Sequence, residues 1–399
     1  MIASHSQTAQ TLIIKGPTVT SDKTNADVLD VFGLHRDLIS LPVLEVDRPI
    51  GLSSRGIFMS QMSKPYYREL YEKKSCIAFM DKSPLIVEVD TPVETLATRA
   101  VESGYKTLAD GFVIVDKGRF AGVGTGLDLM HALAALQAEK NHQIMLSIDY
   151  ASNIQRAMLS ESRNALYATL KDAEIVWLPR DVIGGDYYHF RSYDDGWFAA
   201  IADCTGHGVP GAFLTLIASS ALTHALDHQG PHNPAGLMGE VSRNMKLALG
   251  QHSASVHADS NDGMDAVFFW FDRATRRLTS SHANMALLVM RPSASEILSI
   301  KGERTGLGYA DTRADMAWKN HETQLEAGTL LCCCTDGLID QIGGRKNIAF
   351  GNRRLRQALQ RHRDLPIAEL THQLMNEFES YQGGQSRRDD LTLFNLRVD

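Results

Sequence analysis

The sequence has no long apolar run, and this absence limits where the protein can act. No uninterrupted apolar stretch approaches the roughly 18 residues of a membrane-spanning helix, and the start, MIASHSQTAQTLIIK, has only a very short one. We therefore expect neither a signal peptide nor a membrane anchor, and a cytoplasmic protein.

Cysteine is also scarce. There are five cysteines, an odd number, and no C-x-x-C pair stands beside a second such pair. This pattern argues against a disulfide framework or a zinc site. Cys332, Cys333 and Cys334 lie together in the apolar run TLLCCCTDG, where we expect small buried side chains of a strand.

An excess of positive charge is missing as well. The 399 residues contain 40 Lys and Arg against 47 Asp and Glu, a formal charge of -7, so nothing general attracts nucleic acid or an anionic membrane. The basic run Arg353-Arg354-Leu355-Arg356 has no aromatic residue between its charges, which predicts a solvated helix face or a contact with an acidic partner. At about 100 to 200 residues per domain, the length predicts two or three domains.

Glycine and proline are absent between Gly126 and Pro179. Apolar residues recur within this stretch at the spacing of one helical face: Ile144, Ile148, Ala151, Ile154 and Met158. The stretch predicts one long helix, or two nearly in line, that joins two domains, although a core helix within a single domain would show the same pattern. On a connector, such a stripe favours pairing with its copy in a second subunit, which predicts a homodimer.

We expect four parts along the chain. Residues 1–35 mix Ser, Thr, Asn and Asp without a sustained period, and are predicted to form a mobile tail. Residues 36–140 alternate strand-like and helical runs and form an N-terminal domain. Residues 141–172 form the helical linker, and residues 173–399 form the C-terminal domain.

The N-terminal domain has a helix, a hairpin and a second helix in VETLATRAVES and DGFVIVDKGRFAGVGTG. This order resembles half of a cystathionine-β-synthase-type (CBS) regulatory pair, an α/β domain. In that family, Gly122-x-x-Thr125-x-x-Asp128 would place Thr125 on a phosphate and Asp128 on a ribose, at a helix N-terminus that favours anions. The resemblance implies an adenine nucleotide, but Thr and Asp are also ordinary capping residues. The other half, GLSSRGIFM, has Ser54 at the threonine position and Ile57 in place of the aspartate, so we expect at most one site.

In the C-terminal domain the pattern changes to short strands and four helices. We predict strands in EIVWL, YYHFRSY, WFAAIAD, AVFFWFD, RLTSSHA, ALLVMR, TLLCCCTD and LTLFNLRV, and helices over 209–228, 234–250, 353–361 and 367–381. Many strands with alternate apolar faces and a few helices predict an α+β fold, a two-sheet sandwich covered by helices on both sides.

Several aspartates stand at the ends of these strands beside turns: Asp186, Asp203, Asp336, Asp389 and Asp390. One such residue means little, because Asp commonly begins turns. A group of carboxylates at one sheet edge repels itself unless a cation neutralises it, and both Mg²⁺ and Mn²⁺ prefer oxygen ligands. The sequence therefore predicts a divalent metal site for either ion. It contains neither a P-loop nor a cysteine-phosphatase signature.

The segments RDVIGGDYY, ADCTGHGVPGAF, CTDGLID and RRDDLTLF follow one another in this order. Together they resemble the bacterial PP2C-like (PPM-type) serine/threonine phosphatases of the stage-II-sporulation-E type, which implies a PP2C-like α-β-β-α sandwich. Within that family, DCTGHGVPGAF and TDGLIDQIGG resemble the subgroup that controls biofilm formation by dephosphorylating a small partner protein. A sensor domain on a helical linker is common in the family, and IQRAML resembles its switch helix.

The resemblance implies a role for each matching aspartate. Asp203 would bridge two metal ions, and Asp186 and Asp336 would each contact a metal, directly or through water. Asp389 matches the family's final metal-binding aspartate, and Asp390 matches its neighbour. Because successive strand residues face opposite ways, only one of these two should point fully at the metals.

Three further residues have roles that the resemblance implies or leaves open. The main-chain carbonyl of Cys204 would complete the shell of one metal. His207 would protonate the leaving seryl oxygen, or would serve only the geometry of the turn. Asp265, which begins another strand, would reach a third, weak metal site or would be structural.

We therefore expect a metal-dependent protein phosphatase that hydrolyses phosphoserine or phosphothreonine on a small bacterial regulator. The regulator would be of the anti-anti-sigma type or like the partner of the biofilm subgroup. Two ions would activate the attacking water, so no covalent intermediate is needed. Two alternatives stay open: a catalytically silent scaffold of the same fold, and a nucleotide-responsive module that binds a partner protein.

Overall fold

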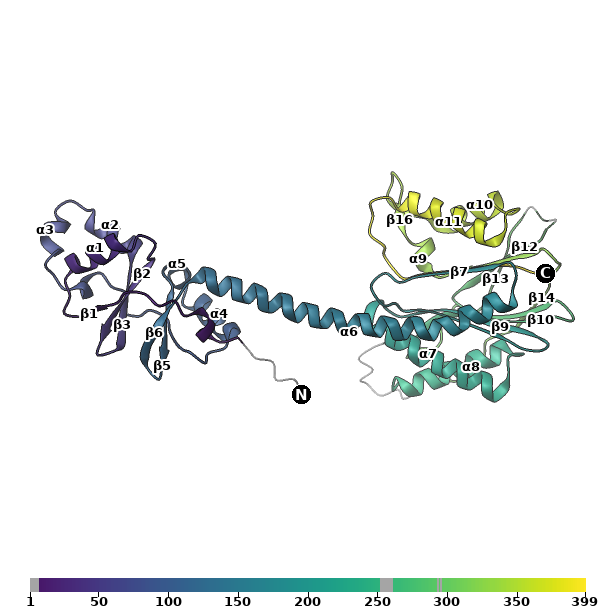
Figure 1. Ribbon diagram of the computed structural model, residues 1–399. Coiled ribbons are helices and arrows are strands. Elements are labelled where there is room, and N and C mark those ends of the chain that lie inside the picture. Colours follow the sequence, from purple (N-terminus) through teal and green to yellow (C-terminus); the bar gives the residue numbers. More distant parts are fainter. Residues whose placement is uncertain (1–6, 252–260, 293, 295) are drawn as a thin grey trace. The chain divides into compact units, whose positions relative to one another are not determined.

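The computed structural model describes residues 7–251, 261–292, 294 and 296–399, and the chain divides into two compact units (Figure 1). Unit 1 spans Met1–Met145 and unit 2 spans Leu146–Asp399. The helix α6 (Gly126–Thr169) contains 44 residues without a break and contributes residues to both units. The prediction of one long helix is therefore confirmed. The helix begins well before the predicted linker, 141–172, because its first turns pack in unit 1.

Unit 1 contains the same order of elements twice. The first half consists of β1 (Val19–Thr20), α1 (Asn25–Leu34), β2 (Ser40–Glu45), β3 (Arg48–Ser54) and α2 (Arg55–Met62). The second half consists of β4 (Ile86–Glu88), α4 (Val93–Glu102), α5 (Tyr105–Asp110), β5 (Phe112–Asp116), β6 (Arg119–Gly124) and α6. In each half the first two strands pair in parallel and the last two pair antiparallel. Short elements complete the unit: η1 (Ala9–Leu12), α3 (Tyr67–Tyr71) and η2 (Cys76–Ala78).

The prediction of a mobile tail over residues 1–35 is wrong for the residues that the structure describes. Ala9 and Phe32 are fully buried in two hydrophobic clusters of unit 1. The polar residues that suggested a loop instead cap α1. The Thr24 hydroxyl accepts a hydrogen bond from the backbone N–H of Asp27, and the Asp27 carboxylate accepts one from the backbone N–H of Thr24. The first six residues lie outside the described part of the chain.

Unit 2 contains two antiparallel five-stranded sheets within its described residues. The first sheet has the order β14-β11-β10-β9-β8, and its strands are β8 (Asp186–Ser192), β9 (Gly196–Cys204), β10 (Met264–Asp272), β11 (Arg277–Ala283) and β14 (His321–Gln324). The second sheet has the order β13-β12-β15-β18-β7, and its strands are β7 (Ala173–Leu178), β12 (Ala286–Met290), β13 (Leu298–Lys301), β15 (Leu330–Cys334) and β18 (Leu391–Arg397). A small hairpin, β16 (Ile342–Gly343) and β17 (Ile348–Ala349), stands apart.

Helices cover both outer faces of this pair of sheets (Figure 1). One layer is α7 (Gly208–Gln229) and α8 (Pro234–Ala248), and the other is α10 (Gly351–Arg361) and α11 (Ile367–Gln382). The predicted two-sheet sandwich is therefore confirmed, with all of the predicted strands and helices present. The short strands β13 and β14 were not predicted.

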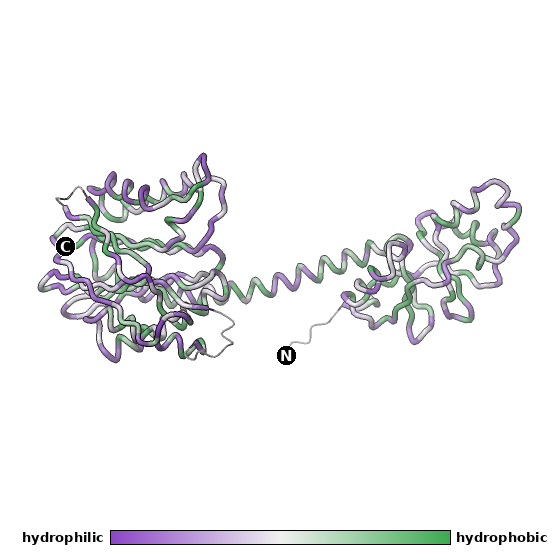
Figure 2. Tube along the Cα trace, turned by 180° about the vertical axis from the view of Figure 1, so that it is seen from behind, coloured by the Kyte–Doolittle hydropathy of each residue, from purple (hydrophilic) through white to green (hydrophobic). Residues whose placement is uncertain are grey.

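Aromatic side chains fill the space between the two sheets. Phe269 of β10 and Phe394 of β18 have ring centroids 5.9 Å apart, and both are at most 1% exposed. The strands of this core appear as long green stretches in the hydropathy trace (Figure 2). Cys333 is buried in this core, and Cys332 is buried on the opposite face of the second sheet; both are free thiols, as the sequence predicts. The packed core holds the strand ends, where the aspartates stand, in fixed positions.

By length and composition, α7 is the one helix in the described ranges that could cross a membrane. In the fold its apolar residues Leu214, Ala218 and Leu222 are buried, and the helix packs against α8 and β8. The core helix of a sandwich passes the same test of length and composition.

Candidate active site

Three aspartates lie side by side on neighbouring strands of the first sheet. Asp203 of β9 stands opposite Asp186 of β8 on one side and opposite Asp265 of β10 on the other. Directly opposed residues of an antiparallel pair have Cβ atoms about 4.5–5.5 Å apart, and like charges placed this way destabilise the sheet. The structure thus brings together two predicted metal ligands and the residue whose role was left open.

Asp186 is the most deeply buried of the three, with 1% exposure. The Thr335 hydroxyl donates a hydrogen bond of 2.8 Å to its Oδ2 atom, and the Thr392 hydroxyl donates one of 2.7 Å to the same atom. The other oxygen, Oδ1, is buried and has no hydrogen-bond partner among the described residues. A buried polar atom without a partner is costly. This oxygen is therefore available to a cation.

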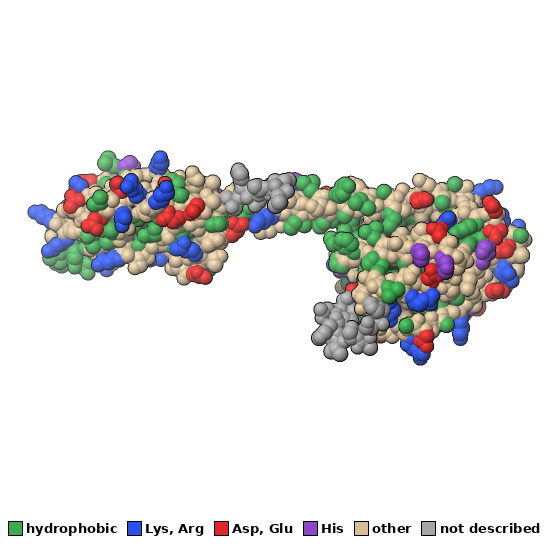
Figure 3. Space-filling view, turned by 90° about the horizontal axis from the view of Figure 1, so that it is seen from below, with side chains coloured by type: hydrophobic (Ala, Val, Ile, Leu, Met, Phe, Trp, Pro, Cys, Tyr) green, Lys and Arg blue, Asp and Glu red, His purple; other side chains and the backbone are tan. Residues whose placement is uncertain are grey.

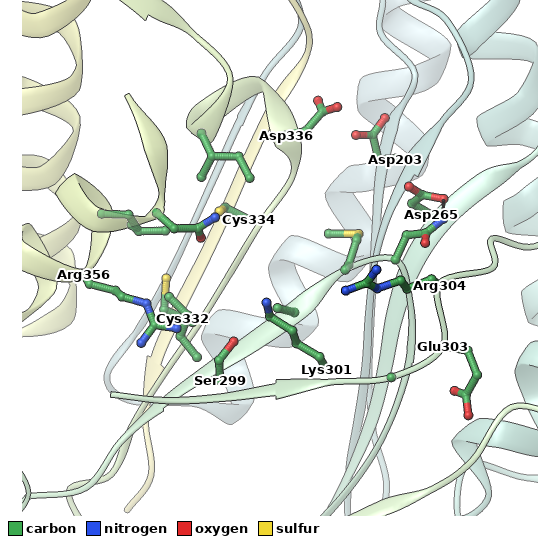
Figure 4. A pocket seen from close by; sticks show the side chains of 18 residues that line it. Asp203, Asp265, Ser299, Lys301, Glu303, Arg304, Cys332, Cys334, Asp336 and Arg356 are labelled. Carbon is green, nitrogen blue, oxygen red and sulfur yellow. Dashed lines mark hydrogen bonds between the residues drawn. The ribbon is translucent and has the colours of Figure 1, made fainter. Parts of the chain in front are cut away.

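The second sheet adds Asp336 and Asp389 to this group. Asp336 follows β15 as the first residue of the short helix α9 (Asp336–Ile339), and Asp389 lies in the loop before β18, two residues from its start. Figure 4 shows Asp336 and Asp203 next to each other at one end of a cavity, with Asp265 beyond them. The candidate site therefore lies where strand ends of the two sheets come together.

Crowding raises the pKa of the carboxyls in this cluster. Burial raises the pKa of Asp203 well above its usual value, and the neighbouring carboxylates, above all Asp186, raise it further. Partial loss of solvent, and then the charge of Asp389, raise the pKa of Asp336 to about 6. At Asp186, burial raises the pKa well above the usual range despite the two threonine hydrogen bonds, which favour the charged form. The cluster therefore retains protons toward neutral pH unless a cation replaces them.

Asp390 has a different task from its neighbour. Its Oδ1 atom accepts a hydrogen bond of 2.6 Å from the backbone N–H of Arg180, and its Oδ2 atom accepts one of 2.6 Å from that of Gly185. Both oxygens thus hold the loop that precedes β8. These contacts differ from the metal-binding role that the sequence predicts for Asp390, and they do not affect the same prediction for Asp389.

Because Gly185 has no side chain, the backbone of the loop before β8 lies very close to the turn after β9. A Cβ atom on Gly185 would lie 2.4 Å from the carbonyl oxygen of Gly206 and 2.9 Å from that of Cys204. The backbone N–H of Cys204 also donates a hydrogen bond of 3.0 Å to the carbonyl of Gly185. The predicted ligand carbonyl of Cys204 therefore lies beside the loop that ends at Asp186.

His207 lies at the start of α7 and has a partner that the sequence did not suggest. Its Nδ1 atom is 2.8 Å from Oδ2 of Asp181, and the two side chains are 41% and 48% exposed. This contact orients the imidazole ring, and it leaves Nε2 as the nitrogen that can exchange a proton with a substrate. Both roles predicted for His207 fit this position.

In unit 1, Thr125 and Asp128 bind each other. The Thr125 hydroxyl donates a hydrogen bond of 2.5 Å to the Asp128 carboxylate, and the backbone N–H of Asp128 donates one of 3.1 Å to the Thr125 oxygen. These contacts cap the first turn of α6, which is the second of the two roles left open by the sequence. In the first half, the hydroxyl of Ser54 donates a hydrogen bond of 2.5 Å to the carboxylate of Asp110. The Asp110 carboxylate therefore lies beside Ser54, the residue that corresponds to Thr125.

The carboxylate cluster of unit 2 fits a divalent cation. Its oxygens are the ligands that Mg²⁺ and Mn²⁺ prefer, and Oδ1 of Asp186 lacks any other described partner. In the described ranges, no three His, Cys, Asp or Glu side chains converge closely enough to form a ready coordination sphere. A cation would therefore draw the carboxylates closer together, and would displace the protons that their raised pKa values retain.

Sequence analysis missed the residues that position Asp186. Thr335 and Thr392 stand inside the motifs CTDGLID and RRDDLTLF, but only their neighbours attracted attention. Gln155 of α6 is 3% exposed, and its Nε2 atom donates a hydrogen bond of 2.7 Å to the carbonyl of Gly184. Its Oε1 atom accepts a hydrogen bond of 3.2 Å from the backbone N–H of Gly184. The position of Gln155 in IQRAML was the available signal, since that segment resembles a switch helix.

Comparison with known proteins gives a consistent result for unit 2. Residues 193–399 match the family Stage II sporulation protein E (SpoIIE). The solved SiaA-PP2C domain of Pseudomonas aeruginosa is 36% identical, with a TM-score of 0.59, and the similarity covers 66% of this chain and 100% of that domain. The phosphoserine phosphatase RsbU of Bacillus subtilis (strain 168) is 24% identical over 277 residues, which are 69% of this chain and 76% of RsbU. RsbX in complex with magnesium is 19% identical over 57% of this chain and 94% of RsbX, with a TM-score of 0.41.

The family match covers half of the chain and lies wholly within unit 2. It therefore does not reach unit 1, whose resemblance to a CBS domain stays a prediction. The matched range and the 36% identical domain confirm the predicted PP2C-like fold. The chain belongs to the SpoIIE family of PP2C-type protein serine/threonine phosphatases.

Proposed function

We propose that this protein hydrolyses phosphoserine or phosphothreonine on a small bacterial regulator protein, and that its aspartate cluster holds two Mn²⁺ or Mg²⁺ ions. The observation that carries the proposal is the register of Asp186, Asp203 and Asp265 across β8, β9 and β10, with Asp336 beside them. Bound ions of this kind lower the pKa of a water molecule and offset charge on the phosphoryl oxygens.

Individual residues of the site have separate roles in this proposal. Asp203 has a carboxylate neighbour on both sides, and is therefore the ligand best placed to serve two ions. Thr335 and Thr392 fix one oxygen of Asp186, which leaves the other for a cation. His207, held by its contact with Asp181, holds a proton at Nε2 for the leaving seryl or threonyl oxygen.

The substrate class follows from similarity. RsbU is named as a phosphoserine phosphatase, and the SiaA-PP2C domain shares 36% of its residues with this chain. These likenesses support a phosphoprotein substrate of the anti-anti-sigma type or of the kind bound by the biofilm subgroup. A silent scaffold would have no need to keep carboxylates that raise the pKa of one another. A cytoplasmic location remains part of the proposal.

Unit 1 is proposed to act as a CBS-like regulatory domain that binds an adenine nucleotide near Thr125 and Asp128. The twofold repetition of its strand and helix order supports this proposal. Nucleotide binding would replace the hydrogen bond between these two side chains with contacts to the phosphate and the ribose. The Asp110 carboxylate beside Ser54 disfavours a phosphate in the other half.

A homodimer through α6 is also part of the proposal. The face of α6 that packs in unit 2 includes Gln155, Leu159 and Leu166, together with Met158, the last residue of the predicted stripe. Two residues of that stripe, Ile144 and Ile154, remain 58% and 47% exposed. Figure 3 shows apolar side chains gathered along α6. A second copy of the helix would remove this apolar surface from water.

The test is phosphate release from phosphorylated candidate regulators by unaltered protein and by Asp203→Asn, with Mn²⁺ and with a chelator. The variant keeps the side-chain shape but removes the bridging charge, so turnover should fall by orders of magnitude. Asp364→Asn is the matched control, because the Asp364 side chain is 97% exposed. Activity that persists in chelator or in Asp203→Asn would contradict the two-metal assignment. Inactivity of every sample would favour the scaffold.

A further inference from the structure

The aspartate cluster forms only one end of a larger cavity of about 570 Å³ (Figure 4). Asp203, Asp265 and Asp336 line this end. The cavity continues along one face of the second sheet toward α10. A phosphoryl group is much smaller than this volume, so the cavity has room for the residues that flank a phosphoserine.

The floor of the cavity is a single sheet face. Ala286 pairs with Lys301, and Leu288 pairs with Ser299, across the β12 and β13 strands. Leu288 also pairs with Cys332 of β15. Residues at alternate positions of a strand share one face, so these side chains form a continuous surface. All five of them line the cavity.

Three cationic side chains line the cavity: Lys301, Arg304 and Arg356. Arg304 lies next to Asp265, whereas Lys301 and Arg356 lie farther from the aspartates (Figure 4). Lys301 and Arg304 are exposed, and neither side chain has a hydrogen bond or an ion pair with any described residue. Glu303, the nearest acid in the sequence, turns its side chain away from both of them (Figure 4). The positive charge of this region is therefore not neutralised within the described structure.

Arg356 belongs to the basic run whose role the sequence left open. Its Nη1 atom donates a hydrogen bond of 2.8 Å to the carbonyl of Ile297, which holds the guanidinium at the rim of the cavity. Arg354 of the same run instead lies over the ring of Tyr381, 4.4 Å from its centroid. Arg353 is exposed and does not line this cavity. Of the three arginines of the run, Arg356 therefore lines the cavity, next to Leu355, and the other two do not.

We propose that this basic part of the cavity, the residues Lys301, Arg304 and Arg356, binds carboxylate side chains that flank the phosphorylated residue of the substrate protein. The inference rests on the proposed function, because it takes the phosphoryl group to lie at the aspartate end. An acidic segment is the occupant that the charges favour, since unpaired cations at a partly enclosed site attract carboxylates more strongly than they would in open solvent. Ser299 and Asn352 supply polar groups for the peptide backbone.

Two fluorescently labelled phosphoserine peptides test this proposal. They differ only in the flanking residues, which are Glu in one peptide and Gln in the other. With Mn²⁺ present, kcat/KM should favour the acidic peptide by about threefold to tenfold, the range expected for a few partly exposed ion pairs. Lys301→Gln should reduce this ratio, and Lys301→Glu should abolish or invert it. Arg353→Gln is the matched control on α10 and should leave the ratio as it is.

Salt and binding measurements separate this proposal from the proposed function. The preference should shrink in about 0.5 M salt, because the charges are screened. Fluorescence anisotropy measures binding of the same peptides without turnover. If neither peptide is hydrolysed but the acidic one binds more tightly, and only while Lys301 is intact, the proposed function fails and the basic site stands. If the acidic and neutral peptides are used equally, or if Lys301→Glu keeps the preference, the basic site is refuted.

Discussion

Replacing Asp336 with Asn should stabilise the metal-free protein while it damages turnover. The reason is the pKa of this carboxyl, which its surroundings raise from 3.8 to about 6. A rise of about 2 pKa units corresponds to about 3 kcal/mol. Because the Asp336 side chain is partly open to solvent, screening reduces the usable effect to about 1 kcal/mol. For a domain of this size, that is about 2–4 °C in the melting temperature.

The effect should depend on pH in a defined direction. The folded protein binds a proton at Asp336 more tightly than the unfolded chain does, so stability falls as the pH rises from 3.8 through about 6. Asn has no charge to lose. The increase in stability caused by Asp336→Asn should therefore be small near pH 4, grow as the pH rises to about 6 and remain constant above about pH 7.

The assay is thermal denaturation followed by circular dichroism, in chelator, across this pH range. Asp364→Asn serves as the control, since its fully exposed side chain should leave the melting temperature unchanged at every pH. In the presence of Mn²⁺ the unaltered protein should have a higher melting temperature than Asp336→Asn. The reason is that the cation binds the unaltered cluster more tightly and so stabilises its folded state. A variant that is less stable above pH 7 in chelator, or a gain that does not vary with pH, would refute the account based on charge repulsion.

Four further predictions follow from contacts described above. Gln155→Leu leaves the two backbone groups of Gly184 without partners, and should cost about 2 kcal/mol in urea denaturation and lower phosphate release; normal turnover would show that α6 does not position this loop. Thr392→Val removes a hydrogen bond that favours the charged form of Asp186, so the acid limb of the pH profile of kcat/KM should move to higher pH at fixed Mn²⁺. Ile154→Asp should give monomers in light scattering, and an unaltered protein that is already monomeric at micromolar concentration would end the dimer model. Asp128→Ala should weaken binding of AMP in calorimetry, whereas no binding by the unaltered protein at millimolar concentration would remove the nucleotide from the proposal.

The strands and helices of unit 2 could be predicted because their signal is local. Continuous apolar runs bounded by turn residues mark β9 and β10, and the absence of Gly and Pro marks α6. The strands β13 and β14 have only four residues each, LSIK and HETQ, and their sequences carry little alternation. They exist because β12 and β11 offer them pairing partners, and a single segment does not reveal its partners.

The aspartates of the candidate site could be picked out from the sequence, but the residues that hold them in position could not. The aspartates could be found because each ends a strand beside a recognisable motif. The carboxylate of Asp390, unlike that of Asp389, accepts hydrogen bonds from the backbone N–H groups of Arg180 and Gly185, which lie far earlier in the chain. The burial of Ala9 and Phe32 likewise depends on elements later in unit 1. Such long-range contacts leave no periodic trace in the sequence.

The position of β18 in the second sheet affects when the enzyme can become active during its synthesis. This strand lies between β15 and β7, and in the described sheet β7 pairs with no other strand. Asp389, Asp390 and Thr392 enter the fold together with it. While residues 389–397 are still inside the ribosome, β7 has no partner and the loop before β8 has no carboxylate to hold it. A nascent chain therefore lacks part of the candidate site, and we expect translation that stops before Asp389 to yield a product without phosphatase activity.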